Sequence, residues 1–252
     1  MSGHSKWHSI KHQKGVTDAR RGQLFTKLTR EIIVAAREGG SNPDANFQLR
    51  LAVQKAHDNN MPQENIERAI KRGSGELEGV ILVEVILEGY GPNGTAILIK
   101  GLTDNRNRTV QEVRSTFSRH GGNLGESGCV SWLFESKGVI TIKTVNLEAD
   151  DLALAAIDAG AEDVKVEGDY IEVYTKPEEL ETVRTALEQN GTSIDSSELQ
   201  MVPKTVVQLD GKAGQQALKL LDKLEEIDGV QSIYSNADFP ESVMESYQTQ
   251  QA

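Results

Sequence analysis

Apolar residues recur every three to four positions through the first third of the chain, which is the spacing of helices that bury one face. In residues 18–38 these positions hold Phe25, Leu28, Ile32 and Ala35. Gly39 and Gly40 follow, where helices commonly stop. Two further stripes occupy residues 43–60, which begin at a proline, and residues 62–73. The pattern therefore predicts three helices in a small N-terminal bundle.

From about residue 80 the apolar positions form short β-rich runs that are separated by glycine-containing turns. Runs at 80–87 and 95–99 predict a hairpin, and a helix over 106–120 and an apolar run at 129–134 follow. The next elements are strand, helix, strand, strand, helix and strand, an order typical of ferredoxin-like domains. We place them at 139–143, 147–159, 164–166, 170–174, 177–190 and 192–199.

The C-terminal part has the pattern of half such a domain: a strand at 205–209, a helix and a strand at 230–234. Because the half at 80–135 lacks closing elements, the economical interpretation pairs the two halves around an insertion. We therefore predict a multi-domain α+β protein, although a linear string of three domains is the alternative. Its parts are a basic helical domain with a flexible N-terminal arm (1–78), a discontinuous α+β domain (79–135 and 204–240), an inserted ferredoxin-like domain (136–203) and a tail (241–252).

Charge is distributed unevenly along the chain, whose formal net charge is -11. Through residue 72, thirteen Lys and Arg residues face seven Asp and Glu residues, giving +6. The remainder carries fourteen cations against thirty-one anions, giving -17. This asymmetry favours a basic module that contacts a polyanion and is carried by an acidic body. Chance segregation over a solvated surface is the alternative.

The first fifteen residues hold too few apolar side chains to order their backbone, so we expect a flexible arm. Its cations can neutralise phosphates and its tryptophan can stack on an unpaired base. The candidate nucleic-acid-binding residues here are Lys6, Trp7, Lys11, His12 and Lys14. A solvated basic tail without a ligand is the alternative.

The first predicted helix carries cations opposite its apolar stripe. Arg20, Lys27, Arg30 and Arg37 fall within about a third of the circumference. Because Glu31 and Glu38 dilute the later turns, the candidate contacts are Arg20, Arg21, Lys27 and Arg30. An ordinary solvated face is the alternative. If about five phosphates were neutralised, affinity would fall by two to three orders of magnitude between about 50 and 200 mM salt.

A second candidate contact lies at residues 103–109, where a predicted strand joins a helix. Free backbone amides and the guanidinium groups of Arg106 and Arg108 could bind an anion or an RNA phosphate there. The alternative is a capped helix start whose arginines pair with the acidic body.

Other chemistry finds little support in the sequence. Cys129 lies in an apolar run, and the motifs of metalloproteases, serine hydrolases and nucleotide-binding loops are absent, so we expect no enzyme, cofactor or small-molecule substrate. His4, His8 and His12 have helical spacing, but no carboxylate or cysteine joins them, so we expect no metal site. A single cysteine, a polar N-terminus and the lack of a long apolar segment predict a cytoplasmic protein with no membrane contact.

Five separated motifs resemble those of one known family, the YebC family, which includes the mitochondrial translational activator of cytochrome c oxidase. They are GHSKWHSIKHQKG at 3–15, DARRGQLFTKLTREI at 18–32, NNMPQENIERAIKRG at 59–73, EGYGPNGTA at 88–96 and TDNRNRTVQEVR at 103–114. The resemblance covers essentially the whole chain. It departs at Gln13, where relatives often carry a basic residue, and at Cys129, where relatives vary.

The resemblance implies a three-domain fold with a cleft, one helical and two α+β domains. It also implies a cytoplasmic protein of a family classed as DNA-binding transcriptional regulators, some of whose members resemble ribosome-associated factors that help translation through consecutive prolines. The nucleic-acid surface that it implies comprises Lys6, Trp7, Lys11, Lys14, Arg20, Arg21 and Lys27.

Three functions remain open at this point. A DNA-binding transcriptional regulator is favoured by the basic helical region, whereas a translation factor bound to ribosomal RNA and the ribosome is favoured by the aromatic-basic arm and the Arg106/Arg108 loop. A protein-interaction adaptor would use the α+β domains and their acidic surface. The prediction common to the first two is a nucleic-acid-associated regulator of gene expression.

Overall fold

The computed structural model describes residues 18–143, 149–167, 170–240, 242–244 and 246. The chain divides into two compact units, which are described separately. Unit 1 comprises Met1–Arg30, Val80–Glu135 and Pro203–Ala252, and unit 2 comprises Glu31–Gly79 and Ser136–Val202. The α+β, multi-domain class with an N-terminal helical region is confirmed, while the domain boundaries drawn from the sequence stay predictions.

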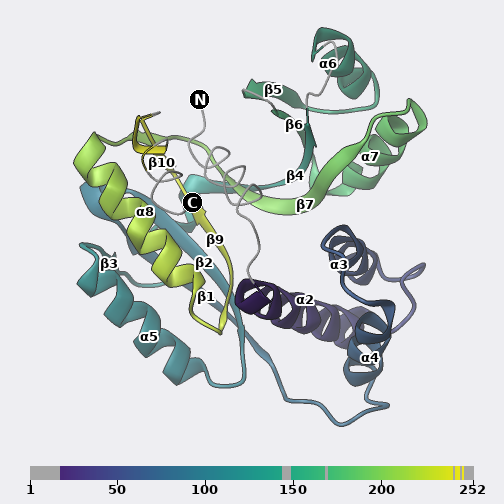
Figure 1. The fold of residues 1–252 in the computed structure, drawn as a ribbon, viewed down its shortest axis with the longest axis horizontal. Helices are drawn as coiled ribbons and strands as arrows, with labels where there is room; N and C mark the ends of the chain where they lie inside the picture. Colours follow the sequence, from purple (N-terminus) through teal and green to yellow (C-terminus); the bar gives the residue numbers. More distant parts are fainter. Residues whose placement is uncertain (1–17, 144–148, 168–169, 241, 245, 247–252) are drawn as a thin grey trace. The chain divides into compact units, whose positions relative to one another are not determined.

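Unit 1 is built around a four-stranded antiparallel sheet in the order β3-β1-β2-β9 (Figure 1). The strands are β1 (Val83–Tyr90), β2 (Ala96–Thr103), β3 (Asn123–Leu124) and β9 (Val230–Ser235), and a short turn of helix, η1 (Pro92–Gly94), joins the first two. Because β9 pairs with β2, Ile99 lies opposite Ile233 although the two are far apart in sequence. The sheet therefore unites segments from both sides of residues 136–202.

Two helices, α5 (Arg106–Arg119) and α8 (Gly211–Glu225), pack against this sheet and against each other. Their apolar positions fill one core with the strands: Phe117 and Leu220 are completely buried and lie in the same cluster as Ile99. The first half of α2 (Asp18–Gly39) also belongs to unit 1. Burial of one face of each element thus determines which side chains of α5 point to solvent.

Unit 2 has a sheet in the order β5-β6-β4-β7, produced by the chain order β4, α6, β5, β6, α7, β7. This is the βαββαβ order of a ferredoxin-like fold. The elements are β4 (Phe134–Lys143), α6 (Ala149–Asp158), β5 (Asp163–Glu167), β6 (Tyr170–Thr175), η3 (Pro177–Glu179), α7 (Leu180–Gln189) and β7 (Ile194–Pro203). The sheet of unit 1 also packs against two helices, but the chain order of its strands and helices differs from βαββαβ.

The predicted helical bundle appears as the second half of α2, α3 (Phe47–Asp58) and α4 (Gln63–Gly73). The helix expected to begin at residue 43 begins at Phe47, because the Asn46 side chain accepts a hydrogen bond from the Leu49 amide and so caps it there. The same side chain donates to the Ala35 and Gly40 carbonyls, which joins α3 to the end of α2.

Two sequence-based strand predictions differ most from the structure. Residues 80–81 precede β1, and Ile81 is 78% exposed. The strand expected at 205–209 is reduced to β8 (Val207–Gln208), which pairs with β10 (Ala237–Asp238) in a separate two-stranded sheet. In the apolar run at 129–134, residues 129–133 form a loop with the short helix η2 (Ser131–Leu133), where the Val130 and Ser131 amides bind a buried carboxylate, and Phe134 begins β4. In the part of the chain that the structure describes, every helix is too short or too polar to cross a membrane.

Candidate nucleic-acid interface

The sequence-predicted contacts fall into three groups. The arm residues Lys6, Trp7, Lys11, His12 and Lys14 lie outside the described residues, as do His4 and His8. Arg20 lies in α2, but its side chain is not described, whereas Arg21 is exposed in the next position. Lys27 and Arg30 lie further along the same helix. Arg106 and Arg108 lie in the first turn of α5.

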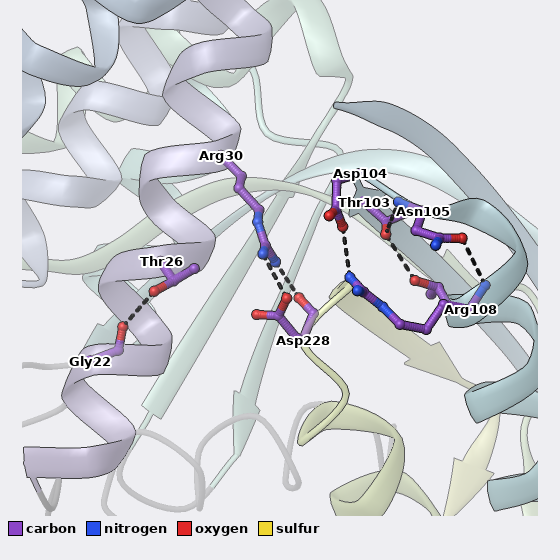
Figure 2. A network of polar contacts seen from close by, with 9 residues as sticks. Gly22, Thr26, Arg30, Thr103, Asp104, Asn105, Arg108 and Asp228 are labelled. Carbon is purple, nitrogen blue, oxygen red and sulfur yellow. Dashed lines mark hydrogen bonds and ion pairs between the residues drawn. The ribbon is translucent and has the colours of Figure 1, made fainter. Parts of the chain in front are cut away.

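Arg30 binds the protein itself. Its Nη2 atom lies 2.7 Å from Oδ2 of Asp228, and Nη1 donates to the Asp228 backbone carbonyl (Figure 2). The Arg30 side chain is 16% exposed, so this two-pronged contact is largely shielded. Because Asp228 lies between α8 and β9, Arg30 attaches α2 to that corner of unit 1.

Lys27 acts at the same corner. Its Nζ atom donates to the backbone carbonyl of Glu225 at 3.0 Å, at the C-terminal end of α8, where a cation is favoured by the helix dipole. In return, the side chain of Gln231 donates to the Lys27 carbonyl at 2.9 Å. Helical spacing predicted a cationic face, but tertiary contacts across about two hundred residues occupy Lys27 and Arg30. A role for either in binding phosphate would require these bonds to be exchanged.

The loop before α5 is a well-formed helix start. Thr103 Oγ1 accepts hydrogen bonds from the Asn105 amide and from Thr109 Oγ1, while Asn105 Oδ1 accepts from the Arg108 amide at 3.1 Å (Figure 2). Arg108 Nη2 also lies 2.7 Å from Asp104 Oδ1, in an ion pair whose two side chains are about half exposed. These contacts match the capped start that was the alternative interpretation. An exposed pair contributes little stability, so Arg108 can exchange Asp104 for a phosphate at small cost.

Two further arginines extend this group along α5. Arg114 and Arg119 are exposed, as is Arg106, whereas Val113 and Phe117 are completely buried in the core. We call Arg106, Arg108, Arg114 and Arg119 the α5 arginines. Glu112 is the one carboxylate in the helix, which is about 20 Å long. Arg114 and Arg119 were not among the sequence-predicted contacts, although four arginines in fourteen residues are a clear signal in the sequence.

The partly buried thiol of Cys129 has an environment that opposes nucleophilic chemistry. Burial, followed by the negative charge of Glu88, raises the pKa of the Cys129 thiol. A raised pKa keeps the thiol protonated at neutral pH, whereas reactive cysteines need the thiolate. Among the described residues, no group of three or more His, Cys, Asp or Glu side chains is placed to hold a metal ion.

Comparison with known proteins gives matches over nearly the whole chain. Residues 5–76 match the model of the TACO1/YebC protein N-terminal domain, and residues 82–237 match that of the TACO1/YebC second and third domain. A "Probable transcriptional regulatory protein" of Dehalococcoides mccartyi is 61% identical over 250 residues, covering 99% of this chain and 100% of the relative. A protein with the same descriptive name from Trichlorobacter lovleyi is 53% identical, covering 97% and 99%.

A solved structure shows the same fold. The crystal structure of a conserved hypothetical protein from Aquifex aeolicus superimposes with a TM-score of 0.82 at 51% sequence identity. The match covers 89% of this chain and 93% of the other.

Proposed function

The chain belongs to the TACO1/YebC family, and from that premise we propose that it is a cytoplasmic, nucleic-acid-binding regulator of gene expression that acts as a DNA-binding transcriptional regulator. The observation that carries this proposal is the set of exposed arginines on α5, in a chain whose relatives are named as transcriptional regulatory proteins. Guanidinium groups suit phosphate oxygens, which they can bind through two parallel hydrogen bonds.

In the proposed interface, Arg106, Arg114 and Arg119 contact phosphates directly, and Arg108 does so by exchanging Asp104. Further proposed contacts come from Arg20, Arg21 and the arm residues Lys6, Trp7, Lys11, His12 and Lys14. Lys27 and Arg30 contribute by holding α2 in place more than by touching the ligand. Contacts with phosphates supply affinity and orientation but do not distinguish one base sequence from another. A preference for particular promoters therefore requires a further group that contacts base edges.

A second candidate function is a ribosome-associated translation factor that promotes elongation through difficult sequences such as consecutive prolines. The observation that favours it is the same set of exposed arginines on α5, since a helix whose buried side faces its own sheet can present them to the irregular surface of folded RNA as well as to a duplex. A regulator of either kind needs no catalytic residue.

Ultraviolet crosslinking in living cells separates the two functions. Attached DNA and RNA are recovered in parallel from cells that make the intact chain, an arm deletion of residues 1–15, or the triple variant Arg106→Gln/Arg114→Gln/Arg119→Gln. Defined promoter fragments that disappear with the triple variant support the transcriptional regulator. If ribosomal RNA is recovered and DNA is recovered only at the level of random fragments, the result supports the translation factor and contradicts the transcriptional regulator. If neither nucleic acid is recovered above an uncrosslinked control, the proposed function is wrong.

A further inference from the structure

Trp132 is an exposed aromatic residue in unit 1 that is held in a fixed position. Trp132 lies in η2 and is 65% exposed. Such exposure is unusual because the indole ring is a large apolar surface. The indole Nε1 atom donates to the Cys129 carbonyl at 3.1 Å. Because this polar edge is already bonded, the part of the ring left for a ligand is its π face.

The loop beneath Trp132 is organised by a buried carboxylate. Glu88, on β1, is 4% exposed, and its two oxygens accept hydrogen bonds from the amides of Gly128, Val130 and Ser131, each at 2.7 Å. Burial alone would raise the pKa of Glu88, but the three hydrogen bonds from the amides together lower it by more, so the pKa lies below its ordinary value. The carboxylate is therefore ionised at neutral pH and fixes the backbone on either side of Cys129.

A second aromatic ring shares the same anchor. The Tyr90 hydroxyl donates to the Cys129 carbonyl at 2.9 Å, and Tyr90 is 39% exposed. One carbonyl oxygen thus fixes the polar ends of both Trp132 and Tyr90. Two aromatic side chains that are oriented before any ligand arrives lose little conformational entropy on binding.

A cation lies at the edge of this group. Lys204 Nζ donates to the Trp132 carbonyl at 3.2 Å, and the Lys204 amide donates to the Leu133 carbonyl at 2.9 Å, so the exposed lysine is fixed to the backbone of η2. A rigid aromatic face beside an ammonium group is the combination that binds a base and its phosphate in single-stranded nucleic acids.

We propose that Trp132 is a stacking platform for one unpaired base of a single-stranded nucleic acid, with Lys204 contacting an adjacent phosphate and Tyr90 positioning the Trp132 ring. This inference rests on the proposed nucleic-acid function and adds to it a second kind of contact, with bases instead of phosphates. Glu126, before the loop in sequence, is exposed and its negative charge disfavours a second phosphate strand, so the platform favours single strands over duplexes.

Trp132 fluorescence provides the test. The chain contains two tryptophans, so Trp7→Phe leaves Trp132 as the single emitter. The ligands are a single-stranded oligonucleotide of about ten nucleotides and an abasic oligonucleotide with the same number of phosphates. We expect the first to quench Trp132 emission and the second to leave it unchanged. In the same background, Trp132→Ala leaves no tryptophan, so its affinities are measured by the fluorescence anisotropy of dye-labelled strands; the variant lowers affinity for the base-containing strand about tenfold to hundredfold and leaves affinity for the abasic strand unaltered.

Matched variants control for folding and surface chemistry. Ile86→Ala removes another exposed apolar side chain of unit 1, 56% exposed, and should change neither affinity. Trp132→Phe keeps an aromatic face but loses the bond to Cys129, so affinity for the base-containing strand should fall by less than it does in Trp132→Ala. Circular dichroism should be the same for all variants, since no buried side chain is altered.

The outcomes separate this inference from the proposed function. If the intact chain binds both strands equally and Trp132→Ala has no effect, the platform is refuted while phosphate binding stands. If a proline-rich or apolar peptide quenches Trp132 and the oligonucleotide does not, the loop is a peptide site and the inference is wrong. If no strand and no duplex binds, both the inference and the proposed function fail.

Discussion

In unit 1, the first half of α2 and the whole of α5 both carry cations, but these cations have different partners. On α2, Lys27 and Arg30 bind the carbonyl of Glu225 and both the carbonyl and the carboxylate of Asp228. On α5, Arg106, Arg114 and Arg119 are exposed. Helical spacing identifies a cationic face in both cases, but only the tertiary partners show whether that face holds the fold together or is presented to a ligand. The comparison predicts that substitutions on α2 change stability, whereas substitutions on α5 change binding.

The largest effect on stability should come from Glu88, whose charged side chain, like that of Arg30, binds other groups of unit 1. Glu88→Ala leaves the amides of Gly128, Val130 and Ser131 without their acceptor, and we expect the free energy of unfolding to fall by about 3 kcal/mol. Urea unfolding monitored by Trp132 fluorescence in a Trp7→Phe background measures this. A loss below about 1 kcal/mol would show that the carboxylate does not organise the loop.

The pH dependence of Glu88 has a defined direction. Because its pKa is lower in the folded state than in the unfolded chain, its ionised form stabilises the fold above the unfolded value of about 4.3. That contribution is lost as the pH falls through the folded pKa. The difference in unfolding free energy between the intact chain and Glu88→Gln should therefore be constant near pH 7 and narrow below about pH 4. A difference that widens in acid would contradict this assignment.

Arg30 should have the next largest effect. Arg30→Met keeps much of the aliphatic stem but removes the contacts to Asp228, and we expect a loss of about 1–2 kcal/mol in the free energy of unfolding. Arg106→Gln on α5 is the matched control and should change stability by less than about 0.5 kcal/mol. Equal losses of unfolding free energy in the two variants would contradict the claim that the α2 cations stabilise the fold and the α5 cations do not.

Lys27 should contribute less. Lys27→Met removes a cation from the C-terminal end of α8, and the expected loss is about 0.3–1 kcal/mol, screened by salt. Unfolding in low and high salt measures the effect, which should shrink in high salt. A loss independent of salt would indicate packing of the lysine stem instead of its charge.

The smallest effect should come from Asp104. Asp104→Asn removes an exposed partner of Arg108, which should alter stability by about 0.5 kcal/mol or less and raise affinity for nucleic acid slightly, because one competing anion is gone. Unfolding and binding titrations in parallel would show whether stability and affinity respond separately. A fall in affinity would mean that Asp104 orients Arg108 for its ligand.

Periodicity predicted most helices correctly because each buries one continuous face, as Val113 and Phe117 do on α5. It assigned no element to the apolar run at 129–134, since a strand and a loop around Glu88 have similar composition, and the carboxylate that binds the amides of this run lies about forty residues earlier. Prediction of the site has the same limit, since spacing does not reveal contacts between residues that are remote in sequence. The partners of Lys27 and Arg30 are remote in sequence, so spacing alone could not reveal them, whereas Arg114 and Arg119 could have been found from charge.

The most direct test of the central claim is the salt dependence of duplex DNA binding, measured by fluorescence anisotropy. For Arg106→Gln/Arg114→Gln/Arg119→Gln, the slope of log affinity against log salt should be shallower by about 2.7, with affinity lower by about a hundredfold near 0.1 M salt. The matched variant Arg68→Gln/Lys71→Gln/Arg72→Gln removes the same charge from exposed positions of α4 and should change the slope by less than about 1. Equal changes from the two variants, or an unchanged slope in the α5 variant, would contradict the assignment of α5 as the interface.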